Sequence, residues 1–246
     1  MRHKFLFFSF LFLSALAFSQ EDDFLNADNP SQSEDTYILP KNLFHIENAF
    51  TFSEGSYSDN LAFRYGVGSG VELKLSADFS FQKSSTEVDA ITLTAKYGIT
   101  EQRGLLPAIS LFANLQYEPQ NAEKYSTDFL IVTKHALSSR FSLGTNFGAD
   151  AHFSQYDMVT ELSFSLSKRI NLLTEYFATF SEGSPPSHNL DLGLAYIFKP
   201  DIQFDFLIAH PIFSSHSEPF LSVGVSYRGR FKKSSELYTH RLKSHF

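Results

Sequence analysis

The chain has 246 residues, a formal net charge of −7 and no cysteine. Its length allows one large domain or two small ones. The lack of cysteine excludes a disulfide scaffold, a thiolate metal site and a lipid-modified N-terminal cysteine, and the acidic balance argues against nucleic acid as a partner.

Residues 1–19 have the pattern of a cleaved secretory signal. Arg2 and Lys4 give a positively charged start, and residues 5–18 form an apolar run. This run is too short to cross a bilayer comfortably as a helix, although an uncleaved membrane anchor is the alternative. We expect export through this signal, with cleavage before Gln20.

Residues 20–41 form an acidic and polar stretch in which the apolar residues follow no regular period. Segments of this kind bury too little apolar surface to build a packed core of their own. We therefore expect an acidic N-terminal linker at 20–41, ahead of the structured part of the chain.

From residue 42 to residue 231 apolar and polar side chains alternate with a period of two, which is typical of β-strands. Clusters of Gly, Ser, Asn and Pro recur at strand-length intervals and mark the turns. The pattern predicts strands at 42–52, 59–68, 70–82, 88–98, 107–117, 127–137, 140–152, 157–166, 170–180, 189–198, 202–212 and 220–230. Each is about ten residues long, the length at which a tilted strand crosses an outer membrane.

The links between these strands alternate in length over much of the chain. Tight links are expected at 68–70, 138–139, 167–169 and 199–201, and longer ones at 53–58, 83–87, 118–126, 181–188 and 213–219. Such alternation is typical of the extracellular loops and periplasmic turns of a membrane barrel. The links at 100–106 and 153–156 break the pattern.

The alternation puts apolar side chains such as Phe63, Leu73 and Leu192 on one face and charged ones such as Arg64 and Glu175 on the other. This fits a soluble sandwich with its apolar side inward, or a membrane barrel with its apolar side toward lipid. Uniform strand length, and Tyr and Phe near the strand ends, favour the barrel, because aromatic girdles lie at both bilayer interfaces. Closure in lipid also satisfies every backbone N–H and C=O. The sequence therefore predicts an all-β protein, an antiparallel up-and-down transmembrane β-barrel of about twelve strands.

The polar face of this barrel would surround the lumen. Isolated buried charges are costly, so ionisable groups there must meet water or pair with one another, for example across the lumen. One interpretation is a selectivity filter, and the other is a salt-bridge network that rigidifies a nearly closed barrel. The lumen-lining residues concerned are Glu47, Arg64, Glu72, Lys74, Asp78, Lys96, Asp150, Glu161, Glu175, Asp191, Asp205 and Arg228.

Two patterns offer chemistry other than passage through a pore. His152 and Ser154, with Asp150 beside them, lie near a strand end and could form the activated nucleophile of an outer-membrane lipid hydrolase. Three histidines near expected outer loops could meet around a metal: His188, His210 and His216. Chance spacing and ordinary solvated histidines explain both patterns more simply, so we expect no enzyme, no metal and no cofactor.

The order of several short motifs resembles a known family. "LAFRYGVGSGVELKL" at 61–75, "INLLTEYF" at 170–177 and "LDLGLAYIFKPDIQFDF" at 190–206 are similar to strands of the outer-membrane proteins named for the MetA pathway of phenol degradation. Members of that family are usually called transporters. The likeness extends from about residue 42 to residue 231.

The resemblance implies a porin-like barrel in the outer membrane of a Gram-negative cell, with passive passage of small, hydrophobic or aromatic solutes. Its partners would be the lipid bilayer, the outer-membrane assembly machinery and the solute. Barrels of this kind tend to end on an aromatic residue of the last strand. Phe231 would hold that place, with a basic tail at 232–246 beyond it. A structural or interaction barrel with a plugged lumen is the alternative function.

Overall fold

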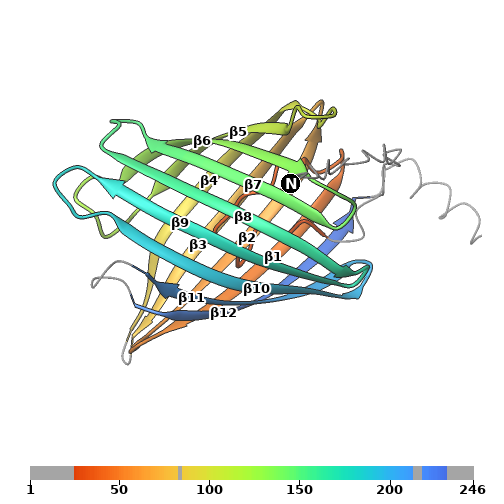
Figure 1. Ribbon diagram of the computed structural model, residues 1–246. Coiled ribbons are helices and arrows are strands. Elements are labelled where there is room, and N and C mark those ends of the chain that lie inside the picture. Colours follow the sequence, from red (N-terminus) through yellow and green to blue (C-terminus); the bar gives the residue numbers. More distant parts are fainter. Residues whose placement is uncertain (1–24, 83–84, 213–217, 232–246) are drawn as a thin grey trace, which may run out of the picture.

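The computed structural model describes residues 25–82, 85–212 and 218–231, so the expected signal at 1–19 and the expected tail at 232–246 lie outside the described residues. Within these ranges twelve antiparallel strands close into a barrel, and each strand pairs with its neighbours along the chain (Figure 1). The predicted fold class is confirmed. The strands are β1 Leu43–Ser53, β2 Ser56–Gly68, β3 Val71–Gln82, β4 Ser85–Thr100, β5 Ala108–Tyr117, β6 Tyr125–Ala136, β7 Phe141–Asp150, β8 Gln155–Ser167, β9 Ile170–Ser181, β10 Ser187–Lys199, β11 Ile202–Pro211 and β12 Phe220–Arg230.

The barrel closes where the first strand pairs with the last. Leu43 of β1 lies opposite Arg230 of β12, and the register continues without a shift to Ser53 opposite Phe220. Every strand therefore has two neighbours, and the sheet has no free edge that would expose unpaired backbone groups to lipid.

The connections depart from the expected alternation of long and short links. The sequence predicts a long link at 53–58, yet Ser53 lies opposite Ser56 and strand pairing continues almost to the turn. At the opposite end of the barrel the link at 101–107 is long, in agreement with the exception predicted at 100–106, and Arg103 pairs with Leu106 across it. The polar residues near 53–58 belong to the ends of β1 and β2, which remain paired up to the turn. Their polar composition resembles that of a loop, so the sequence did not distinguish the two.

The outer surface of the barrel is apolar. Phe63, Leu73 and Leu192 are 39%, 41% and 60% exposed on it, whereas Arg64 and Glu175 on the inner face are fully buried. The described residues contain no helix long and apolar enough to cross a membrane. The predicted orientation, with apolar side chains toward lipid and ionic ones inside, is confirmed, and the barrel is of the outer-membrane type.

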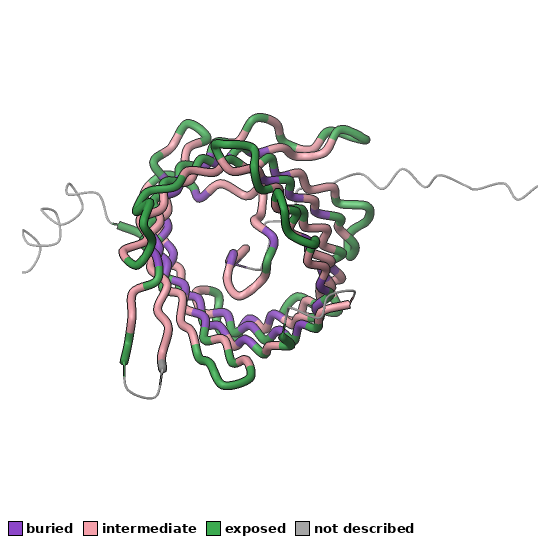
Figure 2. The backbone as a smooth tube through the Cα atoms, turned by 90° about the vertical axis from the view of Figure 1, so that its left-hand side faces the viewer, coloured by how far each residue is buried: buried purple, intermediate pink, exposed green. Residues whose placement is uncertain are grey.

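Residues 25–41, called the lumen segment below, lie inside the barrel. Figure 2 looks along the barrel and shows chain curled within the ring of strands. Leu25 and Leu39 in this segment are 0% and 1% exposed. The structure corrects the expected linker over these residues, because the segment does not need a core of its own when the barrel wall supplies partners for its backbone and its charges.

Candidate functional site

Glutamates of the barrel wall accept hydrogen bonds from the backbone of the lumen segment. Glu47 on β1 accepts the N–H groups of Asp28 and Asn29, at 3.0 and 3.2 Å from its Oε2. Glu72 on β3 accepts the N–H of Leu39 at 2.8 Å. Hydrogen bonds to a carboxylate are stronger than those between neutral groups, so these contacts hold the segment at both of its ends.

The tip of the segment meets a row of three carboxylates. Glu161 on β8, Glu175 on β9 and Asp191 on β10 lie opposite one another in the strand register. Glu175 accepts the N–H groups of Gln32 and Ser33, both at 2.9 Å and one on each carboxylate oxygen. The Ser33 hydroxyl donates to Glu161 at 2.7 Å. Like charges placed side by side on a sheet repel, and these donors from the segment offset that repulsion.

Arg64 on β2 is the centre of a buried ionic cluster. Its Nε donates to Glu72 at 2.7 Å, and its Nη1 donates to Glu47 and to the backbone oxygen of Asn26, at 2.8 and 2.9 Å. The same Nη1 lies 3.2 Å from Asp28 Oδ1. Arg64 thus links neighbouring strands to the segment, so the pairs of this cluster run along the wall and inward, and the predicted pairs across the lumen are not formed by it.

Two lysines bind the acidic side chains of the segment. Lys74 on β3 pairs with Glu34 and lies 3.4 Å from Asp28 Oδ2. Lys134 on β6 pairs with Asp35. The cations of the wall therefore face the carboxylates of the segment, while carboxylates of the wall face its N–H groups.

These surroundings perturb the acids of the lumen segment in different directions. Burial alone would raise the pKa of Asp28, but the Arg64 guanidinium and its neighbouring cations outweigh it and hold that pKa well below its usual range. Burial and then repulsion from Asp28 raise the pKa of Glu34 to about 7. For Asp35 burial also opposes ionisation, yet Lys134 prevails and lowers the pKa.

The remaining predicted residues contact the wall or a turn. Six of the twelve, Glu47, Arg64, Glu72, Lys74, Glu161 and Glu175, touch the lumen segment. The other contacts are Asp78 with Asn60 at 2.6 Å, Asp191 with the Glu175 N–H at 3.1 Å, Asp205 with Gln203 at 2.9 Å, Arg228 with the Pro200 oxygen at 2.8 Å, and Lys96 with the Phe112 ring at 4.9 Å. Asp150, the twelfth, lies at the β7–β8 turn.

Asp150 accepts the hydroxyl of Ser154 at 2.6 Å and also the backbone N–H groups of Ser154 and Gln155, at 2.7 and 3.0 Å. This is the arrangement of a capped turn, in which an Asp side chain replaces missing backbone partners. Asp150 is the last residue of β7 and lies opposite Asp128 in the register, so its role as a lumen-lining selectivity residue stays a prediction. The Ser154 hydroxyl donates to Asp150 here, and not to His152 as the hydrolase alternative requires.

The histidines also have local partners. His188 lies 2.7 Å from the Tyr176 hydroxyl, and His210 lies 2.6 Å from the Pro211 oxygen. His216 lies outside the described residues. Among the part of the chain that the structure describes, no group of three or more metal-ligating side chains comes together.

Small residues on the inner face make room for the segment. A Cβ on Gly66 would lie 2.1 Å from the Pro40 oxygen, and one on Gly98 would lie 3.1 Å from the Ile38 side chain. The Asn42 N–H donates to the Gly66 oxygen at 3.0 Å, which keeps the chain against the wall at this point. A glycine is needed at Gly66 because backbone approaches backbone there more closely than any side chain allows.

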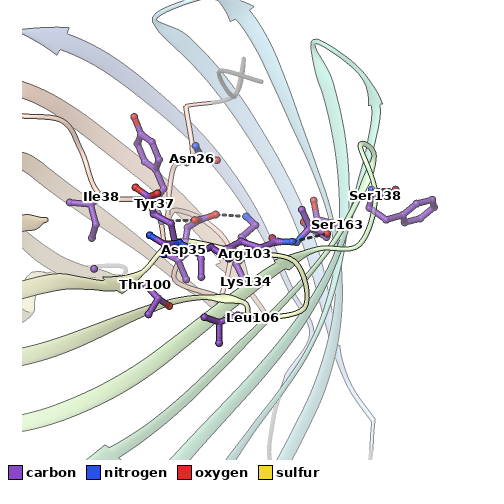
Figure 3. Close-up of a pocket in the computed structure, with 18 of the residues that line it drawn as sticks. Asn26, Asp35, Tyr37, Ile38, Thr100, Arg103, Leu106, Lys134, Ser138 and Ser163 are labelled. Carbon is purple, nitrogen blue, oxygen red and sulfur yellow. Dashed lines mark hydrogen bonds and ion pairs between the residues drawn. The ribbon is translucent and has the colours of Figure 1, made fainter. Parts of the chain in front are cut away.

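A cavity of about 1020 Å³ remains beside the segment, at the end of the barrel that carries the β2–β3 and β6–β7 turns. Figure 3 shows Arg103, Lys134 and Ser163 around it, with Lys134 paired to Asp35 of the segment. Most of its lining residues are polar, with hydroxyl and amide groups from Thr36, Thr100, Ser142, Ser163, Ser165 and Asn171, and apolar side chains such as Ile38 and Leu106 lie between them. The lumen is thus narrowed by the segment but keeps a polar space along β4 to β9.

The link at 101–107 shapes the mouth of this cavity. Gln102 exchanges two hydrogen bonds with the backbone of Ala136, at 3.1 and 2.7 Å. The backbones of Arg103 and Leu106 pair with each other at 3.0 Å. The link is therefore fixed to the end of β6 and places Arg103 at the mouth.

Sequence reasoning missed several residues that bind the segment. Lys134 shares its face of β6 with Leu130 and Val132, so this strand had no clearly polar side. Asn146 and Gln203 lie on the polar faces of their strands, and attention to charge alone passed over them. If alternation is followed through every strand and uncharged amides are counted as polar, Asn146 and Gln203 are assigned to the inner face.

Comparison with known proteins gives one family and several structural neighbours. The family model described as "Putative MetA-pathway of phenol degradation" matches residues 27–229. No curated protein matches the chain. The COG4313 outer membrane channel from Pseudomonas putida F1 is similar with a TM-score of 0.62 and 11% identity, covering 81% of this chain and 100% of that one. The KdgM porin (TM-score 0.60, 12% identity, 74% and 98% covered) and the NanC porin (0.60, 8%, 75% and 98%) are similar too.

At these identities the structural neighbours bear on the fold alone, and they agree with the closed barrel and its apolar outer surface. The family match covers most of the chain, including the greater part of the lumen segment. The resemblance noted in the sequence is confirmed, and the chain belongs to the family described as "Putative MetA-pathway of phenol degradation".

Proposed function

We propose that this protein is a passive outer-membrane channel for small solutes, with a bore narrowed by the lumen segment. The observation that carries the proposal is the cavity of about 1020 Å³, which leaves space for a solute between the segment and the wall from β4 to β9. Membership of a transporter-like family supports it, as do the printed names of the KdgM and NanC porins and the COG4313 channel, by analogy of fold.

The solutes are small and polar. Most residues of the lining carry hydroxyl, amide or charged groups, and such groups replace the water of a polar solute better than they accommodate a hydrophobic one. The pore needs no catalytic group, and insertion by the outer-membrane assembly machinery is part of the same proposal.

The predicted lumen residues have two roles in this proposal. The six that touch the segment set the width of the pore, because they decide whether the segment stays in place. Asp78, Lys96, Asp191, Asp205 and Arg228 set the charge of the wall around it. Selectivity of the pore thus depends on the lumen segment, which can leave, as well as on the fixed charges of the wall.

The second candidate is a structural barrel with a plugged lumen that displays its outer loops to partners. The segment favours this reading, because it is tied to the wall by carboxylates and by cations along its length. The two functions differ in whether ions cross the barrel.

Planar-bilayer recordings of the full chain distinguish them. The repelled-segment variant, defined as Asp28→Lys with Glu34→Lys and Asp35→Lys, places cations against Arg64, Lys74 and Lys134 and should drive the segment from the lumen. We expect small open steps for the native protein and steps about twofold or more larger for the variant. Bilayers that stay silent with both proteins support the structural barrel.

The matched control changes the net charge equally at exposed outer loops, with Glu123→Lys, Glu182→Lys and Glu218→Lys. It should conduct as the native protein does. Equal enlargement in the control would mean that net charge, and not release of the segment, alters the pore.

A further inference from the structure

The wall recognises the main chain of the lumen segment at several places, including Glu72 and Gln203, which accept the N–H groups of Leu39 and Leu25. Glu47 and Glu175 each accept two consecutive backbone N–H groups. With its amide oxygen turned toward the segment, Asn146 accepts the Glu34 N–H at 2.5 Å and donates to the Glu34 oxygen at 3.3 Å. Contacts of this kind depend on a peptide backbone and not on any one side chain, as in other modes of peptide recognition.

The wall recognises acidic side chains at three further places. Arg64, Lys74 and Lys134 face Asp28, Glu34 and Asp35 of the segment. N–H acceptors thus lie on β1, β3, β7, β9 and β11, and cations lie on β2, β3 and β6. A ligand that satisfies both sets must carry carboxylates together with amide N–H donors.

We propose that this part of the lumen is a binding site for short acidic peptides, and that the lumen segment occupies it as an internal ligand. The inference deepens the proposed function, on which it rests, by naming the solute class. A simple polyanion pairs with the cations but meets Glu47 and Glu175 without donors and is repelled. A simple cation meets the opposite problem, so both classes bind less well than an acidic peptide.

The covalently attached segment competes with any free peptide. A tethered ligand acts at an effective concentration of about a millimolar or more, so a peptide added to the native protein will rarely displace it. The repelled-segment variant removes this competitor and leaves every wall residue unchanged, which makes the full chain suitable for a binding test.

The chain contains no Trp, so a Trp added to a peptide supplies the sole Trp emission in the mixture. The probe is the peptide LNADNPSQSEDTYILPK of residues 25–41 with a C-terminal Trp. Its fluorescence anisotropy is measured as detergent-solubilised repelled-segment variant is added. We expect saturable binding, and about tenfold or more weaker binding of the Asn peptide, which carries Asn at the positions of Asp28 and Asp35 and keeps Glu34.

Changes in the wall test the backbone contacts. Glu175→Gln in the repelled-segment variant should weaken the native peptide about tenfold, because the amide keeps one acceptor but turns a donor toward the second N–H. The matched control is Glu182→Gln in an exposed outer loop, which should leave binding unchanged. Citrate, a polyanion without N–H donors, should not displace the peptide at comparable concentration.

Several outcomes overturn the inference: no binding by a folded variant, equal binding of the Asn peptide, or displacement by citrate. These outcomes leave the channel intact if the same variant still conducts. Saturable binding with silent bilayers supports the peptide site and removes the channel. Heat-modifiable gel mobility reports folding, and the single Glu34→Lys variant serves for the same titration if the triple variant does not fold.

Discussion

Ser33 and Glu175 are 142 residues apart in the sequence, and inside the barrel the Ser33 N–H donates to Glu175 Oε1 at 2.9 Å. The contact joins the tip of the lumen segment to β9. Glu175 is fully buried. In an open lumen water would hydrate its carboxylate, whereas here backbone N–H groups of the segment donate to it. The charged wall therefore binds the lumen segment. Removing one of the wall residues that bind it should loosen the segment while the barrel stays folded.

The first prediction uses the absence of native cysteine. Ser33→Cys introduces a single thiol at a buried position, 8% exposed in the native side chain. Reaction with a methanethiosulfonate reagent should be slow in this background and about tenfold faster when Glu175→Gln is added, because the tip then loses a charge-assisted acceptor.

The control for this labelling is Ser33→Cys with Glu182→Gln, a change of the same type in an exposed loop. It should react as slowly as Ser33→Cys alone. Fast labelling in every background would mean that the tip leaves the wall without help from a mutation, which contradicts the assignment of Glu175 as the residue that binds it.

The second prediction concerns Gly66. An added Cβ would lie 2.1 Å from the Pro40 oxygen and 2.2 Å from the Leu39 oxygen, and both are backbone atoms that cannot rotate away. Overpacking of this type costs about 1–3 kcal/mol. Gly66→Ala should therefore displace the end of the segment nearest β1 and enlarge the conductance steps, with heat-modifiable mobility retained.

Gly144→Ala is the matched control, because it also faces the lumen but its Cβ would have ordinary contacts, the nearest at 3.6 Å. Its conductance should equal that of the native protein. If the two alanine variants behave alike, the close approach at Gly66 does not hold the segment in place.

The barrel could be predicted from the sequence because one physical constraint is repeated in every strand. Phe63 and Leu73 must face lipid while Arg64 and Lys74 must not, and this alternation fixed strand number, strand position and face. The position of residues 25–41 could not be predicted in the same way. Their partners are single residues on separate strands, such as Glu47 and Glu175, and no local period records a contact over such distances in the chain.

The candidate site was predicted in part for the same reason. The charged inner face, including Arg64 and Glu72, could be predicted because side chains alternate between the two faces of a strand, and this alternation can be read from neighbouring residues. Which charges pair depends on the register and on the occupant of the lumen. An acidic, aperiodic stretch has the composition of a disordered linker, and only a partner surface of complementary charge, here Lys74 and Lys134, gives it a fixed place.

The third prediction is a pH dependence carried by Glu34. Burial, with repulsion from Asp28, raises the pKa of Glu34 from 4.5 to about 7 when the segment is in the lumen. A raised pKa means that the docked state binds a proton that the released state has lost, so docking weakens as the pH rises from about 4.5 to about 7. Conductance should therefore be larger at about pH 7.5 than at about pH 5.5.

Glu34→Gln isolates this effect from the titration of other carboxylates. It should remove most of the difference in conductance between the two pH values. Any pH response that remains then comes from carboxylates of the wall. Asp28 and Asp35 have lowered pKa values and act with the opposite sign, because their contribution to docking is lost only as the pH falls into the acid range. A native response identical to that of Glu34→Gln would contradict the assignment.

The fourth prediction concerns the stability of the buried cluster around Arg64. Arg64→Met keeps an apolar stem of similar length but leaves Glu47, Glu72 and Asp28 without the cation that they share. Removing one partner of a buried ion pair costs about 3–5 kcal/mol, because an uncompensated charge remains. The urea concentration at which the heat-modifiable band is lost should fall markedly.

Adding Glu47→Gln and Glu72→Gln should restore part of the lost stability, since fewer unpaired charges remain. Arg230→Met at an exposed site is the control and should leave the urea midpoint unchanged. An unchanged midpoint for Arg64→Met would show that water or the remaining cations replace the guanidinium in the folded barrel.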